Sequence, residues 1–138
     1  MSSMQGAASG VVVLAALGAA AIEAIKPAPE MPPVVITELR WNGERIIYER
    51  AAEQETLGTW TAVVLTEGTE TEVCSGGSRA TYEKGSKRHV WSLDTLTEDK
   101  GCSDRIPPGE EVYVMVTITP LNGALPYSKR TGPFKLKP

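Results

Sequence analysis

Residues 34–50, VVITELRWNGERIIYER, are two runs of β-forming residues joined by the dipeptide Asn42-Gly43. An Asn-Gly pair between two such runs is the strongest short-range signal for a β-hairpin, because these residues tolerate the positive φ angles that a two-residue turn requires. A two-residue turn would place Leu39 opposite Ile46. The stretch therefore predicts a hairpin with one apolar and one charged face.

The alternation of side chains assigns residues to these two faces. Thr37 would lie opposite Tyr48, and both would share the apolar face with Trp41. The opposite face would carry four charged residues: Glu38, Arg40, Arg45 and Glu49. A face division with period two is what a half-buried sheet needs.

The same alternation recurs along the rest of the chain. It appears at residues 59–68 and most clearly at 111–119, where Pro120 ends the strand and one face carries Val112, Val114, Val116 and Ile118. Shorter candidates are 70–74, 88–93 and 131–136, separated by turn clusters at 75–78 and 107–109. About seven short strands in roughly a hundred residues predict an all-β, antiparallel two-sheet sandwich over residues 34–138.

One part of this region resembles a known family. Residues 106–136, IPPGEEVYVMVTITPLNGALPYSKRTGPFKL, are similar to the closing third of a fibronectin type III domain. The shared pattern is an apolar residue, Pro-Gly, an aromatic residue, alternating apolar residues, an Asn-Gly turn and a final strand. The resemblance implies an immunoglobulin-like or fibronectin-III-like sandwich.

A second resemblance is fainter. Residues 59–96, TWTAVVLTEGTETEVCSGGSRATYEKGSKRHVWSLDTL, look similar to small accessory proteins of bacteriophage particles. This resemblance implies a structural protein of a virion and attaches no role to any single residue.

The N-terminal 25 residues have a different composition. Residues 6–22 carry no charge, and a helix of that length spans roughly 25 Å, slightly less than the hydrocarbon core of a bilayer. We expect an apolar helix over residues 1–25 that serves as a retained membrane anchor. The alternatives are a cleaved signal peptide, although no basic residue precedes residue 6, and a helix packed within a protein assembly.

Glycines provide a second clue about this segment. Gly6, Gly10 and Gly18 would share one helical face, and small residues at such spacing allow close packing of membrane helices. We therefore expect homo-oligomerisation through this face. Residues 26–33, KPAPEMPP, contain four prolines and predict an extended spacer before the sandwich.

The chain has two cysteines, Cys74 and Cys102. Two cysteines and a single histidine do not provide a structural zinc site, so a disulfide is the simplest use. The bridge would close a loop of about 29 residues and contribute roughly 3.6 kcal/mol on the chain-entropy model. It would also place the domain outside the reducing cytosol, and the alternative is two buried thiols.

No motif for catalysis or cofactor binding is present. His89 has no G-x-S-x-G motif or metal-ligand pair with it, so we expect a structural or exposed histidine. The acidic residues Asp94, Glu98, Asp99 and Asp104 do not follow a calcium-loop spacing, and no metal is expected. Four aromatic residues are candidates for stacking on sugars, although a role in the core is the simpler interpretation: Trp41, Trp60, Tyr82 and Trp91.

The net charge of −3 indicates no nucleic-acid partner. The sequence thus predicts a non-enzymatic structural or interaction protein, a membrane-anchored sandwich whose partners are neighbouring proteins of a virion or cell envelope, with a small-molecule ligand not expected. The alternative is a secreted or periplasmic sandwich that binds a carbohydrate or a surface ligand after signal cleavage.

Overall fold

The computed structural model describes residues 14–15, 17–18 and 31–138. Two units are distinguished, Met1–Glu30 and Met31–Pro138. In the first, β2 (Leu14–Ala15) pairs antiparallel with β3 (Leu17–Gly18), so the helix predicted over residues 1–25 is not found at these four positions. The rest of that predicted helix, with Gly6 and Gly10, lies outside the described residues. Among the described residues, no helix has the length and apolarity needed to span a membrane.

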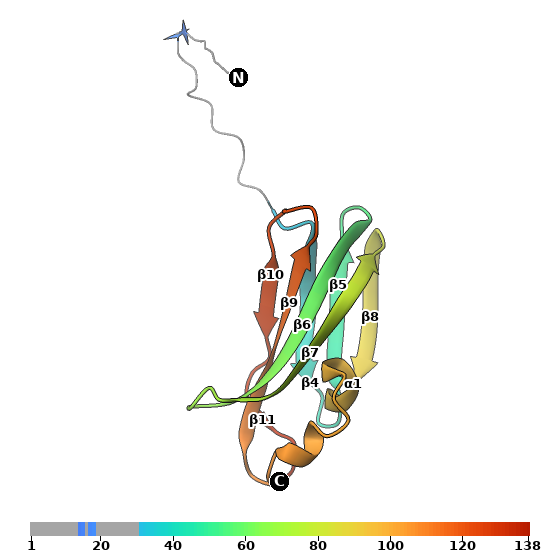
Figure 1. Ribbon diagram of the computed structural model, residues 1–138, viewed down its shortest axis with the longest axis vertical. Helices are drawn as coiled ribbons and strands as arrows, with labels where there is room; N and C mark the ends of the chain where they lie inside the picture. Colours follow the sequence, from blue (N-terminus) through green and yellow to red (C-terminus); the bar gives the residue numbers. More distant parts are fainter. Residues whose placement is uncertain (1–13, 16, 19–30) are drawn as a thin grey trace. The chain divides into compact units, whose positions relative to one another are not determined.

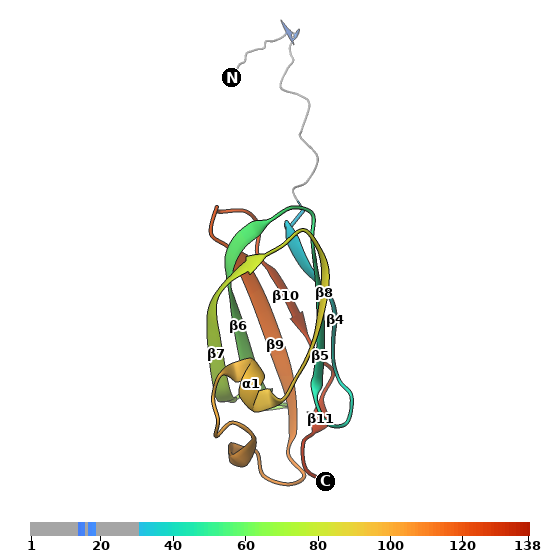
Figure 2. The ribbon, with the colours of Figure 1, turned by 90° about the vertical axis from the view of Figure 1, so that its right-hand side faces the viewer.

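The second unit consists of two antiparallel sheets that pack face to face (Figures 1 and 2). The first sheet has the order β4 (Val34–Trp41), β5 (Ile46–Ala52), β8 (Gly85–Trp91). The second has the order β10 (Tyr127–Arg130), β9 (Glu111–Pro120), β6 (Thr56–Thr66), β7 (Glu72–Tyr82), and β11 (Phe134–Lys135) also pairs with β9. The predicted β-sandwich architecture is confirmed.

The core lies between the two sheets and follows the predicted alternation. The inward face of β9 is fully buried at the four apolar positions that the sequence indicated, Val112, Val114, Val116 and Ile118. The opposite sheet contributes Ile36, Leu39, Ile46 and Tyr48 to the same cluster. Burying these side chains provides most of the free energy that offsets the ordering of the chain.

The first hairpin forms, but its register differs from the prediction. Trp41 pairs with Ile46 and Leu39 pairs with Tyr48, so the turn contains four residues instead of two. The side chain of Asn42 causes this, because its Oδ1 accepts hydrogen bonds from the backbone N–H groups of Glu44 and Arg45 at 2.8 and 2.7 Å. An asparagine side chain that accepts hydrogen bonds from the next backbone N–H groups mimics the hydrogen bonding of a backbone turn.

A register shift between Ile36 and Glu38 also changes the face of Thr37. Thr37 is exposed, and its hydroxyl donates to the backbone carbonyl of Glu49, whereas the prediction placed it on the apolar face. An extra residue in one strand reverses the direction of the side chains that follow it. This shift keeps Leu39 directed into the core.

The segment at residues 75–78 was predicted as a turn and is part of β7 instead. Its glycines serve close packing, because a Cβ on Gly76 would lie 1.6 Å from the backbone oxygen of Thr97. Thr97 ends the short helix α1 (Leu93–Thr97), whose Leu93 and Leu96 are buried. Pairing with the long strand β6 thus outweighs the weak strand propensity of glycine.

Helix α1 begins at a capped residue, since the Ser92 hydroxyl accepts from the backbone N–H of Thr95. A 3₁₀ turn, η2 (Ser103–Arg105), follows it, and Figure 2 shows both helical elements near the end of the sandwich where β8 finishes. The Cys74 and Cys102 side chains are buried, and Cys102 is the N-cap residue of η2. Their Cα atoms are 5.7 Å apart and their sulfurs lie at disulfide distance.

Candidate functional site

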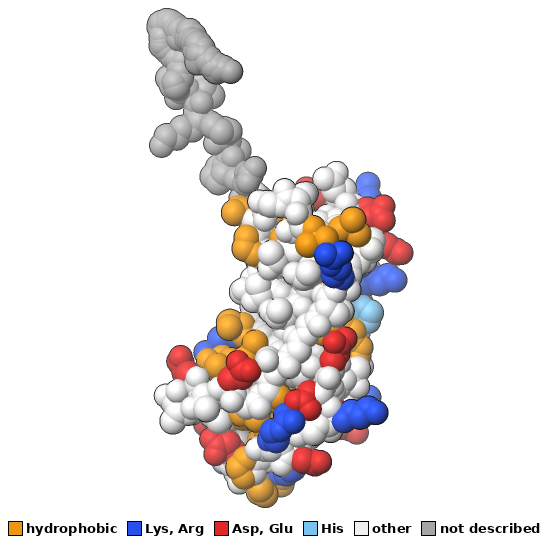
Figure 3. Space-filling model, in the orientation of Figure 1, with side chains coloured by type: hydrophobic (Ala, Val, Ile, Leu, Met, Phe, Trp, Pro, Cys, Tyr) orange, Lys and Arg blue, Asp and Glu red, His pale blue; other side chains and the backbone are white. Residues whose placement is uncertain are grey.

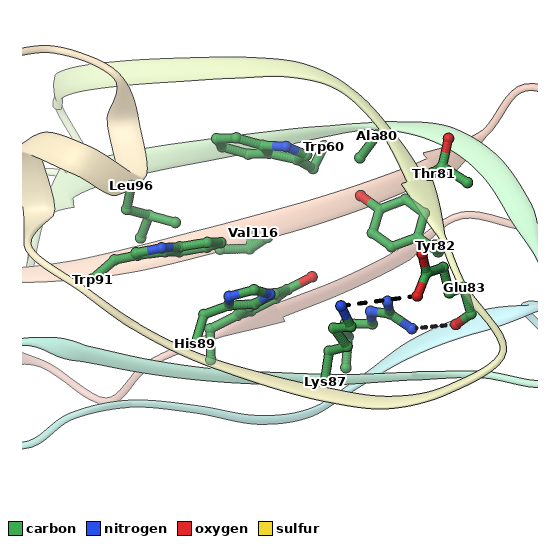
Figure 4. A pocket seen from close by; sticks show the side chains of 12 residues that line it. Trp60, Ala80, Thr81, Tyr82, Glu83, Lys87, His89, Trp91, Leu96 and Val116 are labelled. Atoms are coloured by element: carbon green, nitrogen blue, oxygen red, sulfur yellow. Dashed lines mark hydrogen bonds and ion pairs between the residues drawn. The ribbon is translucent and has the colours of Figure 1, made fainter.

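A pocket of about 320 Å³ opens at the edge of the sandwich formed by β7 and β8 (Figure 4). These two strands end their respective sheets and are not hydrogen-bonded to each other. The edge is therefore open, and side chains from both sheets reach the space between them. The lining residues are Tyr48, Arg50, Trp60, Ala80, Thr81, Tyr82, Glu83, Lys87, His89, Trp91, Leu96 and Val116.

One wall of the pocket is a continuous row of aromatic rings from β5 and β8. His89 and Trp91 occupy alternate positions of β8, so both point to the same side, and their ring centroids are 4.6 Å apart. Tyr48, on the neighbouring strand, pairs with His89 and lies 5.4 Å from Trp91 between ring centroids. Rings at these distances and with nearly parallel planes are stacked on one another and form an apolar cluster.

The facing wall comes from the other sheet. Trp60 projects from β6 toward Trp91, with ring centroids 6.4 Å apart and planes inclined by 22°. In Figure 4, Leu96 of α1 lies at one end of the pocket and Tyr82 of β7 toward the other. The pocket is thus lined by nearly parallel aromatic rings from both sheets.

A buried cation lies in the same pocket. Arg50 is 4% exposed, and its Nη1 donates to the backbone oxygens of Glu83 and Gly85 at 2.6 and 3.0 Å. Its guanidinium carbon lies 5.5 Å from the centroid of the Tyr82 ring. Within residues 31–138, Arg50 forms no ion pair with a carboxylate. A buried charge that is neutralised by no counter-charge is costly, and such groups are usually paired.

Tyr82 provides a buried hydroxyl without a partner. The residue is 5% exposed, and its hydroxyl is the one buried side-chain polar atom in the described part of the chain that forms no hydrogen bond. In Figure 4 the hydroxyl points into the pocket. Burial raises the pKa of Tyr82 to about 12, despite the opposing effect of Arg50, so the hydroxyl stays protonated at neutral pH.

His89 is the single histidine of the chain, and it is visible at the surface in Figure 3. Burial lowers the pKa of His89, and the positive charges of Arg50 and Lys87 lower it further. Its imidazole is therefore neutral at neutral pH and offers one donor and one acceptor nitrogen. At the rim, Lys87 Nζ and Glu83 Oε1 are 3.9 Å apart and largely exposed, a geometry that contributes little to stability.

The other predicted candidates do not enter this site. Trp41 stacks on Phe134, with ring centroids 4.6 Å apart, and so belongs to the edge of the core. In the acidic segment, Asp94 Oδ1 accepts from Ser103 and Asp99 pairs with Arg105. Within the described residues no group of three or more His, Cys, Asp or Glu side chains has the arrangement of a metal site.

The outer face of the first sheet carries charges, as the sequence indicated. Arg88 Nη1 donates to carboxylate oxygens of Glu38 at 2.7 Å and Glu49 at 3.2 Å, and Arg40 also pairs with Glu38. Hydrogen bonds from Arg40 and Arg88 lower the pKa of Glu38. Figure 3 shows side chains of both signs interspersed over the face in view, a distribution typical of a solvated surface.

Sequence reasoning identified Trp60, Tyr82, His89 and Trp91 one by one but did not bring them together. It missed Arg50, although a signal was present: Ile46, Tyr48 and Arg50 alternate along one strand, so the arginine falls on the inward side. A charged residue at an inward position is uncommon and indicates a special environment.

The fold and the pocket define a class, an antiparallel β-sandwich with an aromatic ligand-sized pocket at its open edge. No protein-family model and no curated protein matches the chain. The pocket's own chemistry is therefore the basis for a functional assignment.

Proposed function

We propose that this chain is a non-enzymatic interaction protein that binds its ligand through the pocket between β7 and β8. The single observation that carries the proposal is the buried Arg50 in the lining of an aromatic pocket, with no carboxylate partner among the described residues. Ligand pockets typically combine apolar and aromatic walls with a few polar groups in fixed positions, and this pocket has that composition.

A non-catalytic role suits the surroundings of His89. Its ring contacts are Tyr48 and Trp91, and no described carboxylate orients it as a general base would require. The groups of the pocket are suited to stacking and hydrogen bonding. The geometry thus favours ligand binding over a purely structural contact, whether or not the N-terminal segment is retained.

The finer fold assignment belongs to the same proposal. With the strands lettered A, B, C, C′, E, F and G in chain order, β4, β5 and β8 correspond to A, B and E, and the other sheet to G, F, C and C′. Immunoglobulin-like sandwiches divide their strands between sheets in a similar way. This order supports an immunoglobulin-like or fibronectin-III-like domain.

The placement of the protein is a proposal drawn from the sequence. The disulfide-distance pair Cys74 and Cys102 supports a domain that works outside the reducing cytosol. The uncharged segment 6–22 would tether it to a membrane, and the spacer at 26–33 would hold the sandwich away from that membrane within a cell envelope or a bacteriophage particle. The intact mass of the isolated protein tests the tether, because an anchor must retain residues 1–21 whereas a signal peptide is removed.

The binding role is tested with the full chain and a panel of small ligands from three classes: sugars, short peptides and quaternary ammonium compounds. Trp60 and Trp91 line the pocket, so a ligand that enters it changes their fluorescence. We expect at least one class to bind without being converted, and Trp91→Ala to abolish the response. Trp41→Phe is the matched control, because Trp41 lies outside the pocket. A panel in which no class produces a response that depends on Trp91 would contradict the proposal.

A further inference from the structure

We propose that the pocket between β7 and β8 recognises an acidic sugar, that is, a pyranose ring carrying a carboxylate, as found in uronic acid residues of glycans. The inference rests on the proposed function, since it names the ligand class of that pocket. Three features carry it: an aromatic lining, neutral hydrogen-bonding groups beside it, and a buried positive charge without a carboxylate partner in the described part of the chain.

The aromatic walls suit the apolar face of a sugar ring. Trp60 and Trp91 form an aromatic pair with centroids 6.4 Å apart, the stack continues through His89 and Tyr48, and all four rings line the pocket. A pyranose presents C–H groups on its faces and hydroxyl groups at its rim. Its C–H groups therefore pack against the aromatic side chains that line the pocket, while its hydroxyl and carboxylate groups reach Tyr82 and Arg50. A pocket of about 320 Å³ is near the lower limit for ligand sites, a size that suits one ring at a time.

The Tyr82 hydroxyl suits a ligand that carries hydroxyl groups. It is buried, points into the pocket and forms no hydrogen bond to a described residue (Figure 4). A buried donor without a partner destabilises the folded state, and a ligand hydroxyl at this place would recover the missing bond. His89 adds one neutral donor and one neutral acceptor along the same wall.

Several classes of ligand bind to aromatic side chains, and the charge of the pocket distinguishes between them. A quaternary ammonium group would suit an aromatic cluster such as Tyr48, Trp60, Tyr82 and Trp91. The buried Arg50, however, repels a cation. An arginine held by two backbone carbonyls is oriented and keeps further N–H groups for a carboxylate. At the rim, the charge of Lys87 is balanced by that of Glu83, so Arg50 sets the sign of the pocket. The expected ligand is thus anionic.

A matched pair of sugars tests the charge. Methyl β-D-glucuronide and methyl β-D-glucoside differ only at C6, which is a carboxylate in the glucuronide and a hydroxymethyl group in the glucoside. We expect the full chain, followed by tryptophan fluorescence, to bind the glucuronide at least about tenfold more tightly. Equal affinities, or tighter binding of the glucoside, would overturn the acidic-sugar inference and leave the binding role intact. Absence of a response to both sugars would also overturn it, and the peptide and ammonium arms of the panel then decide the binding role separately.

Tyr82→Phe tests the hydroxyl without changing the shape of the pocket. We expect the affinity for the glucuronide to fall about tenfold while the melting temperature stays equal or rises, because the variant removes an unsatisfied buried group. Tyr127→Phe on β10, outside the pocket, is the control and should leave the affinity unchanged. A Tyr82→Phe variant that melts at a lower temperature and binds normally would show that the hydroxyl serves the fold, and would overturn its assigned role.

Discussion

The indole ring of Trp60 on β6 faces the indole ring of Trp91 on β8, with centroids 6.4 Å apart. The two strands belong to different sheets that share no hydrogen bonds, so side-chain packing alone sets the distance between the two rings. Helix α1 contacts β6 and β7 of one sheet and β8 of the other, so its position also affects the pocket.

The pair Cys74 and Cys102 should be fully oxidised in the isolated protein. Labelling of free thiols in the unfolded, unreduced chain should detect none, and a double replacement by serine should lower the free energy of unfolding by roughly 2–4 kcal/mol. Denaturant unfolding of the two forms measures this difference. Two labelled thiols per chain would show that the cysteines act only as buried apolar residues.

The positive φ of Gly43 should limit what replaces it. Its φ is 101° and no atom lies within 4 Å of the place that an added Cβ would occupy, so the cost of a substitution comes from the backbone alone. Gly43→Val should destabilise the domain by about 1 kcal/mol or more. Gly43→Asn should cost less, because asparagine tolerates positive φ. Circular dichroism measures the melting temperatures of the wild type and the two variants. Equal melting temperatures for all three proteins would be inconsistent with this account.

Gly76 should tolerate no side chain. A Cβ there would lie 1.6 Å from the Thr97 backbone oxygen, so either α1 or β7 must move. Gly76→Ala should cost about 1–3 kcal/mol and also weaken ligand binding, since Leu96 of α1 lines the pocket. Gly132→Ala is the matched control, because no atom lies within 4 Å of its added carbon and its φ is not positive. Urea unfolding measures the midpoints of both variants. Equal midpoints would argue against close packing of α1 on Gly76.

Stability should fall as the pH drops below about 6.5 through the titration of His89. Burial, Arg50 and Lys87 lower its pKa in the folded state, so the unfolded chain binds a proton at a higher pH than the folded domain. Protonation therefore favours unfolding between the unfolded pKa and the lower folded value. Melting temperatures measured from pH 7.5 to 5 should decline in the wild type and decline less in His89→Gln. Parallel curves for the two proteins would exclude His89 as the cause.

Alternating patterns predicted the sheets well because burial of one face imposes a period of two. At Val112, Val114, Val116 and Ile118 the predicted inward face is the observed one. The register of the first hairpin was wrong because the side chain of Asn42 makes local hydrogen bonds that a propensity for a two-residue turn does not include. The prediction of a turn at residues 75–78 was wrong because Gly76 allows close packing against Thr97, a residue distant in the sequence.

The sequence by itself determined the class of the domain and the apolar core positions of its clearest strand, because these depend on local alternation. It indicated a Cys74–Cys102 bridge, with buried thiols as the alternative, and the structure places the two sulfurs at disulfide distance. Only the tertiary structure brought together Arg50, Trp60, Tyr82, His89 and Trp91, which come from four strands in two sheets. The pocket depends on which strands end the sheets and how the sheets face each other. These are long-range properties of packing, and no spacing along the chain encodes them.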